Sequence, residues 1–204
     1  AVQWYIPNII GYIRVILIFS CLFIPVVQPY WLISLLIIAG LLDNLDGYAA
    51  RYLKQSSRYG MVLDYLTDRI TTVVYVKVLT LLLPDYANLF YLLFMMDMAS
   101  HMGRLYLTTW ANGSSHKEIE STFRLLKLYY PRKAVSALMG FCTHSYELFF
   151  IALILLYSRA SLDLPPTLLW GLFILSVPGF VTKNIIHLLQ LAECFKTCAS
   201  FSEP

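Results

Sequence analysis

Charged residues are scarce in this chain of 204 residues. Asp, Glu, Lys and Arg together make up 13% of the chain, whereas hydrophobic residues make up 59%. Soluble globular domains carry about a quarter charged residues. The low charge and the long apolar runs are therefore typical of an integral membrane protein. The formal net charge is only +3, and no run is rich in Lys and Arg, so nothing favours nucleic-acid binding.

Cysteine is also scarce, and the four cysteines have the spacing of neither a disulfide framework nor a zinc site. Cys21 and Cys142 lie in apolar runs, where cysteine usually behaves as a small buried hydrophobic residue. Cys194 and Cys198 lie near a predicted helix end, where we expect free thiols, with palmitoylation as the alternative. Neither a disulfide nor a zinc centre is expected.

Six apolar segments are long enough to cross a bilayer, and prolines or polar stretches separate them. They cover residues 9–27, 31–52, 60–83, 89–107, 134–157 and 168–191. This pattern predicts an all-helical polytopic membrane protein with six transmembrane helices. Because the loops are short, we expect residues 1–204 to form a single membrane domain.

Basic residues are unevenly distributed over the connections between these segments. The connections after the second and fourth segments, together with the C-terminal tail, hold most of them, whereas the opposite connections hold only Arg159. Loops rich in Lys and Arg remain in the cytoplasm. We therefore expect both termini, and any site at the second connection, to face the cytoplasm.

Four aspartates interrupt the second and third apolar segments. Asp43 and Asp46 are three residues apart, and Asp64 and Asp68 are four apart, so each pair shares one face of a helix. The short connection makes the two helices antiparallel neighbours, which brings the carboxylates together. Like charges this close need compensation. Oxygen-only ligands suit Mg²⁺ or Mn²⁺, and two such ions form a clamp for phosphoryl chemistry.

The residues around the aspartates favour a phosphate-handling site. Gly47 has no side chain, so a large ligand can approach the helix backbone there, and Arg51 can pair with a carboxylate or a phosphate. Two alternatives remain open on residue types alone. The aspartates could form structural ion pairs with Arg51 or Arg69, or they could line an ion path in a cation channel or transporter.

Residues 43 to 68 follow the pattern D-x2-D-G-x2-A-R-x8-G-x3-D-x3-D. This pattern resembles the signature of the CDP-alcohol phosphatidyltransferase family at every fixed position. The segments "IPNIIGYIR" (6–14), "LTDR" (66–69), "DMASH" (97–101), "SSHK" (114–117) and "LYY" (128–130) are similar to the eukaryotic branch of that family that makes phosphatidylinositol. The stretch between Tyr130 and Glu147 is longer than that branch leads us to expect.

The resemblance implies an enzyme that transfers a phosphatidyl group from CDP-diacylglycerol to an alcohol and releases CMP. The branch implies that the alcohol is myo-inositol, that the product is phosphatidylinositol, and that the protein is a homodimer in the endoplasmic reticulum membrane. Another acceptor, such as glycerol phosphate, serine or choline, is the first alternative. A cation transporter is the second.

The resemblance also assigns roles to residues of the signature. It implies that two Mg²⁺ or Mn²⁺ ions are held by four metal ligands, Asp43, Asp46, Asp64 and Asp68. The last of these also acts as the catalytic base. Residues that contact the CDP part of the lipid are expected at Gly47, Arg51 and Ser57.

Asp97 and His101 share one face of the fourth apolar segment. They are the candidate acceptor site. Free myo-inositol is neutral, so hydroxyl, amide and imidazole groups should bind it; a structural polar cluster is the alternative. The same two roles are open to His144, Glu147, Lys183 and His187. Of the other basic residues, Arg14 is expected either to pair with the aspartates or to extend to the surface, and Lys77 to extend to the far interface.

Overall fold

The computed structural model describes residues 1–110, 123–129, 137–158 and 163–200. These residues are helical almost throughout, and no strand occurs among them. The all-helical fold class is therefore confirmed. The "SSHK" segment, Arg159 and most of the basic residues of the predicted fourth connection lie outside the described residues.

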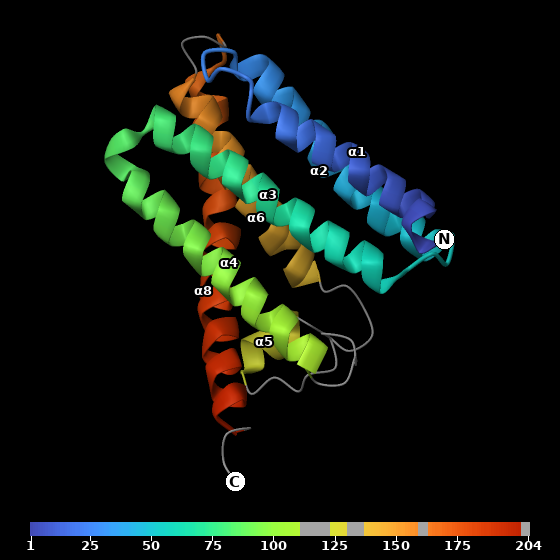
Figure 1. The fold of residues 1–204 in the computed structure, drawn as a ribbon. Coiled ribbons are helices and arrows are strands. Elements are labelled where there is room, and N and C mark those ends of the chain that lie inside the picture. Colours follow the sequence, from blue (N-terminus) through green and yellow to red (C-terminus); the bar gives the residue numbers. More distant parts are fainter. Residues whose placement is uncertain (111–122, 130–136, 159–162, 201–204) are drawn as a thin grey trace. The chain divides into compact units, whose positions relative to one another are not determined.

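Each of the six predicted apolar segments overlaps a long helix (Figure 1), although the first, predicted over residues 9–27, ends as a helix at Cys21. These helices are α1 (Ile6–Cys21), α2 (Pro29–Tyr52), α3 (Arg58–Leu82), α4 (Ala87–Trp110), α6 (Ala137–Tyr157) and α8 (Pro166–Ser200). The short elements are η1 (Val2–Trp4), η2 (Pro84–Tyr86) and α5 (Arg124–Tyr129). Three of the long helices, α2, α6 and α8, have both the length and the hydropathy to cross a membrane. The count of six spans stays a prediction.

Local chemistry explains where several helices begin. Pro7 and Pro29 lie in the first turns of α1 and α2, where the missing N–H of proline breaks no helical hydrogen bond. Ser57 caps α3, because its hydroxyl accepts a hydrogen bond from the backbone N–H of Gly60 at 3.0 Å. Lys54 turns the chain between α2 and α3 with a positive φ of 54°. The short connection that this turn makes is the one the sequence predicted.

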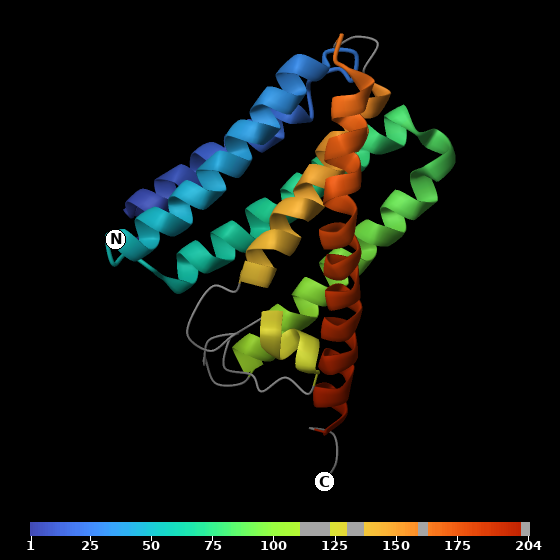
Figure 2. The same cartoon turned by 180° about the vertical axis from the view of Figure 1, so that it is seen from behind.

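The chain divides into two compact units. The first comprises residues 1–87 and 154–164, and the second comprises residues 88–153 and 165–204. In the first unit α1 packs against both α2 and α3, and α1 and α2 lie side by side (Figures 1 and 2). The ammonium of Lys77, which we expected to extend to the far interface, donates to the carbonyl of Leu22 at 2.5 Å, just beyond the end of α1.

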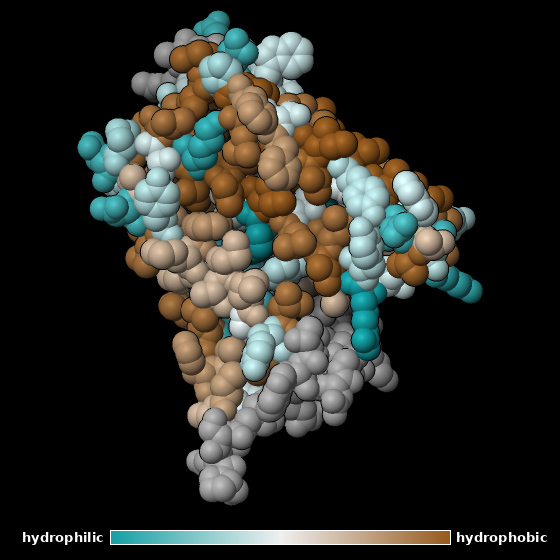
Figure 3. All heavy atoms as spheres, viewed as in Figure 1, coloured by the Kyte–Doolittle hydropathy of each residue, from teal (hydrophilic) through white to brown (hydrophobic). Residues whose placement is uncertain are grey.

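In the second unit aromatic rings join α6 and α8. The Phe149 and Phe180 rings stack with centroids 3.8 Å apart, and Tyr146 stacks on Phe180 at 5.4 Å. Gly179 of α8 faces Ser145 of α6 so closely that a Cβ on the glycine would overlap the serine side chain. Apolar residues cover much of the visible surface (Figure 3), and Phe23 is 85% exposed. An apolar surface of this kind agrees with a lipid environment.

Candidate active site

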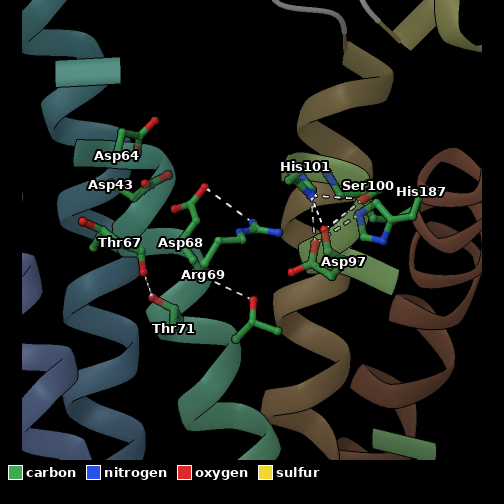
Figure 4. Close-up of polar contacts among 12 residues, drawn as sticks. Asp43, Asp64, Thr67, Asp68, Arg69, Thr71, Asp97, Ser100, His101 and His187 are labelled. Atoms are coloured by element: carbon green, nitrogen blue, oxygen red, sulfur yellow. Dashed lines mark hydrogen bonds and ion pairs between the residues drawn. The ribbon is translucent and has the colours of Figure 1, made fainter. Parts of the chain in front are cut away.

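The four signature aspartates converge in the first unit. Asp43 and Asp46 lie in the second half of α2, and Asp64 and Asp68 lie in the first half of α3. Carboxylate oxygens of Asp43, Asp64 and Asp68 lie within 4.8 Å of one another, and Figure 4 shows these three side chains close together. The spacing on each helix and the short connection therefore produce the predicted cluster.

A single guanidinium joins all four carboxylates. Nη1 of Arg14 donates to Asp46 Oδ2 at 2.7 Å and to Asp64 Oδ1 at 3.0 Å. Nη2 donates to Asp68 Oδ1 at 3.1 Å and forms an ion pair with Asp43. Arg69, on α3, approaches Asp68 at 3.9 Å. Of the two roles open to Arg14, the structure shows pairing with the aspartates, and its side chain is only 3% exposed.

The residues present fit a site for hard divalent cations. All the donor atoms of the cluster are carboxylate oxygens, which are the ligands that Mg²⁺ and Mn²⁺ prefer. Four carboxylates face one arginine and a second, more distant one, so the cluster carries an excess of negative charge. The excess negative charge favours the binding of additional cations.

A cavity of about 210 Å³ adjoins the aspartates. Asp46 and Asp64 contribute to its wall, and so do Gly47 and Ser57, two of the three predicted substrate residues; Arg51 is not among the residues that line it. A Cβ on Gly47 would lie 3.3 Å from Nη1 of Arg51, so the glycine leaves room for that guanidinium. The cavity thus brings two of the three predicted residues of the CDP site next to two of the predicted metal ligands.

Part of the cavity wall comes from α1, and from Gln55 and Ser56 in the connection after α2, and sequence reasoning predicted neither part. Besides Asp46, Asp64, Gly47 and Ser57, the residues that line the cavity are Pro7, Asn8, Gly11, Ala50, Gln55, Ser56, Gly60, Met61 and Leu63. The backbone N–H of Ile6 donates to Gln55 Oε1 at 3.0 Å and fixes the start of α1 against that connection. The buried Asn8 donates from Nδ2 to the carbonyl of Val2 at 2.7 Å. A polar asparagine beside a proline at a helix start was the available signal.

A second polar cluster lies in the second unit (Figure 4). Asp97, on α4, is 1% exposed, and its Oδ1 lies 3.1 Å from Nδ1 of His101 and 3.3 Å from Nε2 of His187, on α8. Nδ1 of His101 also lies 2.8 Å from the carbonyl of Asp97. The structure thus brings the two predicted acceptor residues together. It adds His187, for which the sequence left two roles open.

The other candidate acceptor residues are separate from this cluster or already engaged in pairs. Lys183 donates to the hydroxyl of Tyr129 at 2.6 Å, and His144 is exposed on α6. Arg104, one turn beyond His101, donates to Glu193 at 3.0 Å in a buried ion pair between α4 and α8. These pairs tie α8 to its neighbours.

Residues 4–178 match the CDP-alcohol phosphatidyltransferase family, which covers most of the chain, the four aspartates, and Asp97 and His101 of the second cluster. The chain belongs to the CDP-alcohol phosphatidyltransferase family. No solved structure matches it.

Several curated relatives carry one name, CDP-diacylglycerol–inositol 3-phosphatidyltransferase. The one from Schizosaccharomyces pombe is 35% identical, over 94% of this chain and 87% of the relative. The one from Saccharomyces cerevisiae is 38% identical, over 93% and 84%. The one from Homo sapiens is 33% identical, over 96% and 92%. The similarity therefore spans fungi and animals at nearly full length.

Proposed function

We propose that this protein synthesises phosphatidylinositol by transferring the phosphatidyl group of CDP-diacylglycerol to myo-inositol, with release of CMP. One observation carries the proposal: the carboxylate cluster of α2 and α3 adjoins a cavity lined by Gly47 and Ser57. The names of the relatives support both substrates. Their occurrence in fungi, animals and plants supports the assignment further.

Asp43, Asp46, Asp64 and Asp68 would hold two Mg²⁺ or Mn²⁺ ions. When bound, such ions neutralise the charge of a diphosphate and of a leaving phosphate oxygen. The protein supplies the arrangement of the carboxylates, because α2 and α3 hold them within reach of one another.

Asp68 acts as the catalytic base. Its side chain is 39% exposed, so an incoming hydroxyl can reach it. It accepts the proton of an inositol hydroxyl as that oxygen bonds to the lipid-proximal phosphorus and the bond from phosphorus to the CMP oxygen breaks.

Asp68→Asn tests this role, because it keeps the volume and removes the base. We expect kcat to fall by at least about 100-fold while the protein remains folded. The melting temperature of the purified variant is the control for folding. Wild-type turnover in a well-folded variant would refute the assignment.

Gly47 and Ser57, in the wall of the cavity, and Arg51, beside Gly47, bind the CDP part of the lipid. The glycine supplies space, the arginine supplies a cation for phosphate oxygens, and the serine hydroxyl lies in the wall. Arg51→Ala is expected to raise KM for CDP-diacylglycerol more than KM for inositol. A larger effect on inositol would place Arg51 at the acceptor.

Asp97, His101 and His187 form the acceptor site. A neutral polyol offers hydroxyl groups that can both donate and accept, and a carboxylate beside two imidazoles provides both kinds of partner.

His101→Ala tests the acceptor site, with His144→Ala as the matched control on an exposed histidine of α6. We expect KM for inositol to rise about tenfold in His101→Ala, because a hydrogen bond to a charged group is lost. KM for CDP-diacylglycerol should change little. The control should resemble the wild type. Equal changes in both KM values for His101→Ala would make the cluster a structural one.

CMP release by the purified protein decides between acceptors. CDP-diacylglycerol is supplied with Mn²⁺ or Mg²⁺ and with inositol, glycerol 3-phosphate, serine or choline. Release of CMP that requires inositol supports the proposal. Release with another alcohol would mean that the product is a different phospholipid. A cation transporter would consume no CDP-diacylglycerol, so the absence of release from folded protein would favour that alternative.

We further propose that the protein lies in the endoplasmic reticulum membrane as a homodimer with six spans. The basic connections support an active site and termini on the cytoplasmic side. Labelling of single cysteines placed at Lys54 and Asp163 with an impermeant reagent tests the orientation. Only the first should react from the cytoplasmic side. Light scattering of the detergent complex tests the dimer.

A further inference from the structure

One buried cation contacts every carboxylate of the proposed metal site. The guanidinium of Arg14 reaches one oxygen each of Asp43, Asp46, Asp64 and Asp68. It projects from α1, which supplies none of the four aspartates, to a position among side chains from two other helices.

Among the residues that the structure describes, only these carboxylates hold the guanidinium. Nε of Arg14 is buried and has no hydrogen-bond partner among the described residues, and the hydrogen bonds that Nη1 and Nη2 donate within this part of the chain all go to the aspartates. A guanidinium with five N–H donors can adopt new acceptors by rotating its long side chain. Releasing it from the aspartates therefore breaks no bond to the rest of the protein.

We propose that Arg14 is a resident counter-ion of the four aspartates that competes with divalent metal ions for them. The inference rests on the proposed function, because it takes these carboxylates as the metal ligands. A cation in their midst lowers their mutual repulsion, but it also repels any further cation. Each metal ion must therefore displace ion pairs that the carboxylates already form with Arg14, and this lowers the affinity of the site for metal.

The substrate offers Arg14 a second partner. A diphosphate is an anion whose oxygens match the planar guanidinium, so the group displaced by metal can pair with it. Arg14 then links the two ligands: metal binds weakly alone and more tightly with the nucleotide. Such linkage is reciprocal, because each ligand raises the affinity for the other by the same factor.

Titration of the full-length protein with Mn²⁺ after chelator treatment, followed by the electron paramagnetic resonance signal of free Mn²⁺, tests the competition. Arg14→Gln is expected to bind Mn²⁺ about tenfold more tightly than the wild type, within the range usual for linked sites. Lys54→Gln removes one positive charge from the exposed turn after α2 and is the matched control. It should bind Mn²⁺ as the wild type does.

Arg14→Lys keeps the charge and provides the test should the glutamine variant fail to fold. A single ammonium has three donors on one atom and serves fewer carboxylates than a guanidinium. We expect its Mn²⁺ affinity to be about threefold higher than that of the wild type.

Stability gives a second readout that does not depend on activity. Without metal, the glutamine variant should have a lower melting temperature than the wild type. Saturating Mn²⁺ should reduce this difference in melting temperature, because a ligand that binds the folded protein more tightly stabilises it more. Addition of CDP should raise the Mn²⁺ affinity of the wild type more than that of the variant. Equal effects of CDP on both would overturn the link to the nucleotide.

The outcomes separate this inference from the proposed function. Mn²⁺ binding that is unchanged or weaker in Arg14→Gln, in folded protein, overturns the competition and leaves the metal site intact. Absence of Mn²⁺ binding in both wild type and variant overturns the metal site, and the competition with it.

Discussion

Gly179 provides a test of how closely α6 and α8 pack. The glycine is buried in α8, and a Cβ built on it would overlap the Ser145 side chain and lie 3.2 Å from Cε1 of Phe141. Gly171 lies earlier in α8, is exposed, and has nothing within 4 Å of its Cβ position. The same substitution to alanine therefore meets a packed helix at one position and open space at the other.

The difference between the two variants isolates the cost of the overlap. Replacing glycine by alanine inside a helix gains about 1 kcal/mol at either position. Forcing an extra methyl group into a packed interface costs about 1–3 kcal/mol, because a Cβ cannot rotate away. A stability difference of that size corresponds to about 2–12 °C in melting temperature for a chain of this length. Gly179→Ala should be the less stable variant.

Thermal unfolding of the purified variants in detergent measures this difference. The double variant Gly179→Ala with Ser145→Gly should recover most of the loss, because the atoms that the new methyl group overlaps are gone. Equal melting temperatures for Gly179→Ala and Gly171→Ala would refute the close contact. A double variant no more stable than Gly179→Ala would show that Ser145 is not its cause.

Further predictions concern the cavity, the end of α1 and the metal ions. In Gly60→Ala the new Cβ would lie 2.8 Å from Oδ1 of Asn8, so we expect kcat/KM for CDP-diacylglycerol to fall about tenfold in initial-rate assays. Lys77→Met removes the donor to the Leu22 carbonyl and should lower the unfolding free energy by about 1.5–3 kcal/mol, measured by thermal denaturation. Treatment with a chelator should abolish CMP release, and Mn²⁺ or Mg²⁺ should restore it; activity that survives chelation would contradict the metal site.

The positions of the helices could be predicted because the apolar runs are long and the breaks between them are clear. The boundaries were less accurate, since α8 continues to Ser200 although the apolar segment was predicted to end at 191. Its last turns are kept helical by contacts that a local pattern does not contain. One of these is the buried ion pair of Arg104 with Glu193.

The aspartate cluster could be predicted because its geometry is local. Spacings of three and four residues place each pair on one face, and a short connection forces the two helices together. The position of Arg14 could not be decided in the same way. A lone arginine in an apolar segment can extend to the surface or turn inward, and only the packing of α1 on α2 and α3 distinguishes the two.

His187 is a similar case, because its partners on α4 are distant in sequence. The pair Asp97 and His101 follows from helical spacing, whereas the third member of the cluster depends on how α8 packs within the second unit. The wall that Asn8 contributes to the cavity likewise depends on packing between helices. Local spacing therefore predicts pairs of side chains, and packing determines what completes each site.

The charge balance of the two polar clusters matches the two proposed substrates. Four carboxylates around one guanidinium leave an excess of negative charge, which suits metal cations and, through them, a diphosphate. One carboxylate facing two imidazoles reaches neutrality by taking up a single proton, which suits a neutral polyol. An acceptor that carried a phosphate would need additional cations at the second cluster. Lys183 and Arg104 are already engaged by Tyr129 and Glu193, so the described residues favour an uncharged acceptor over glycerol phosphate.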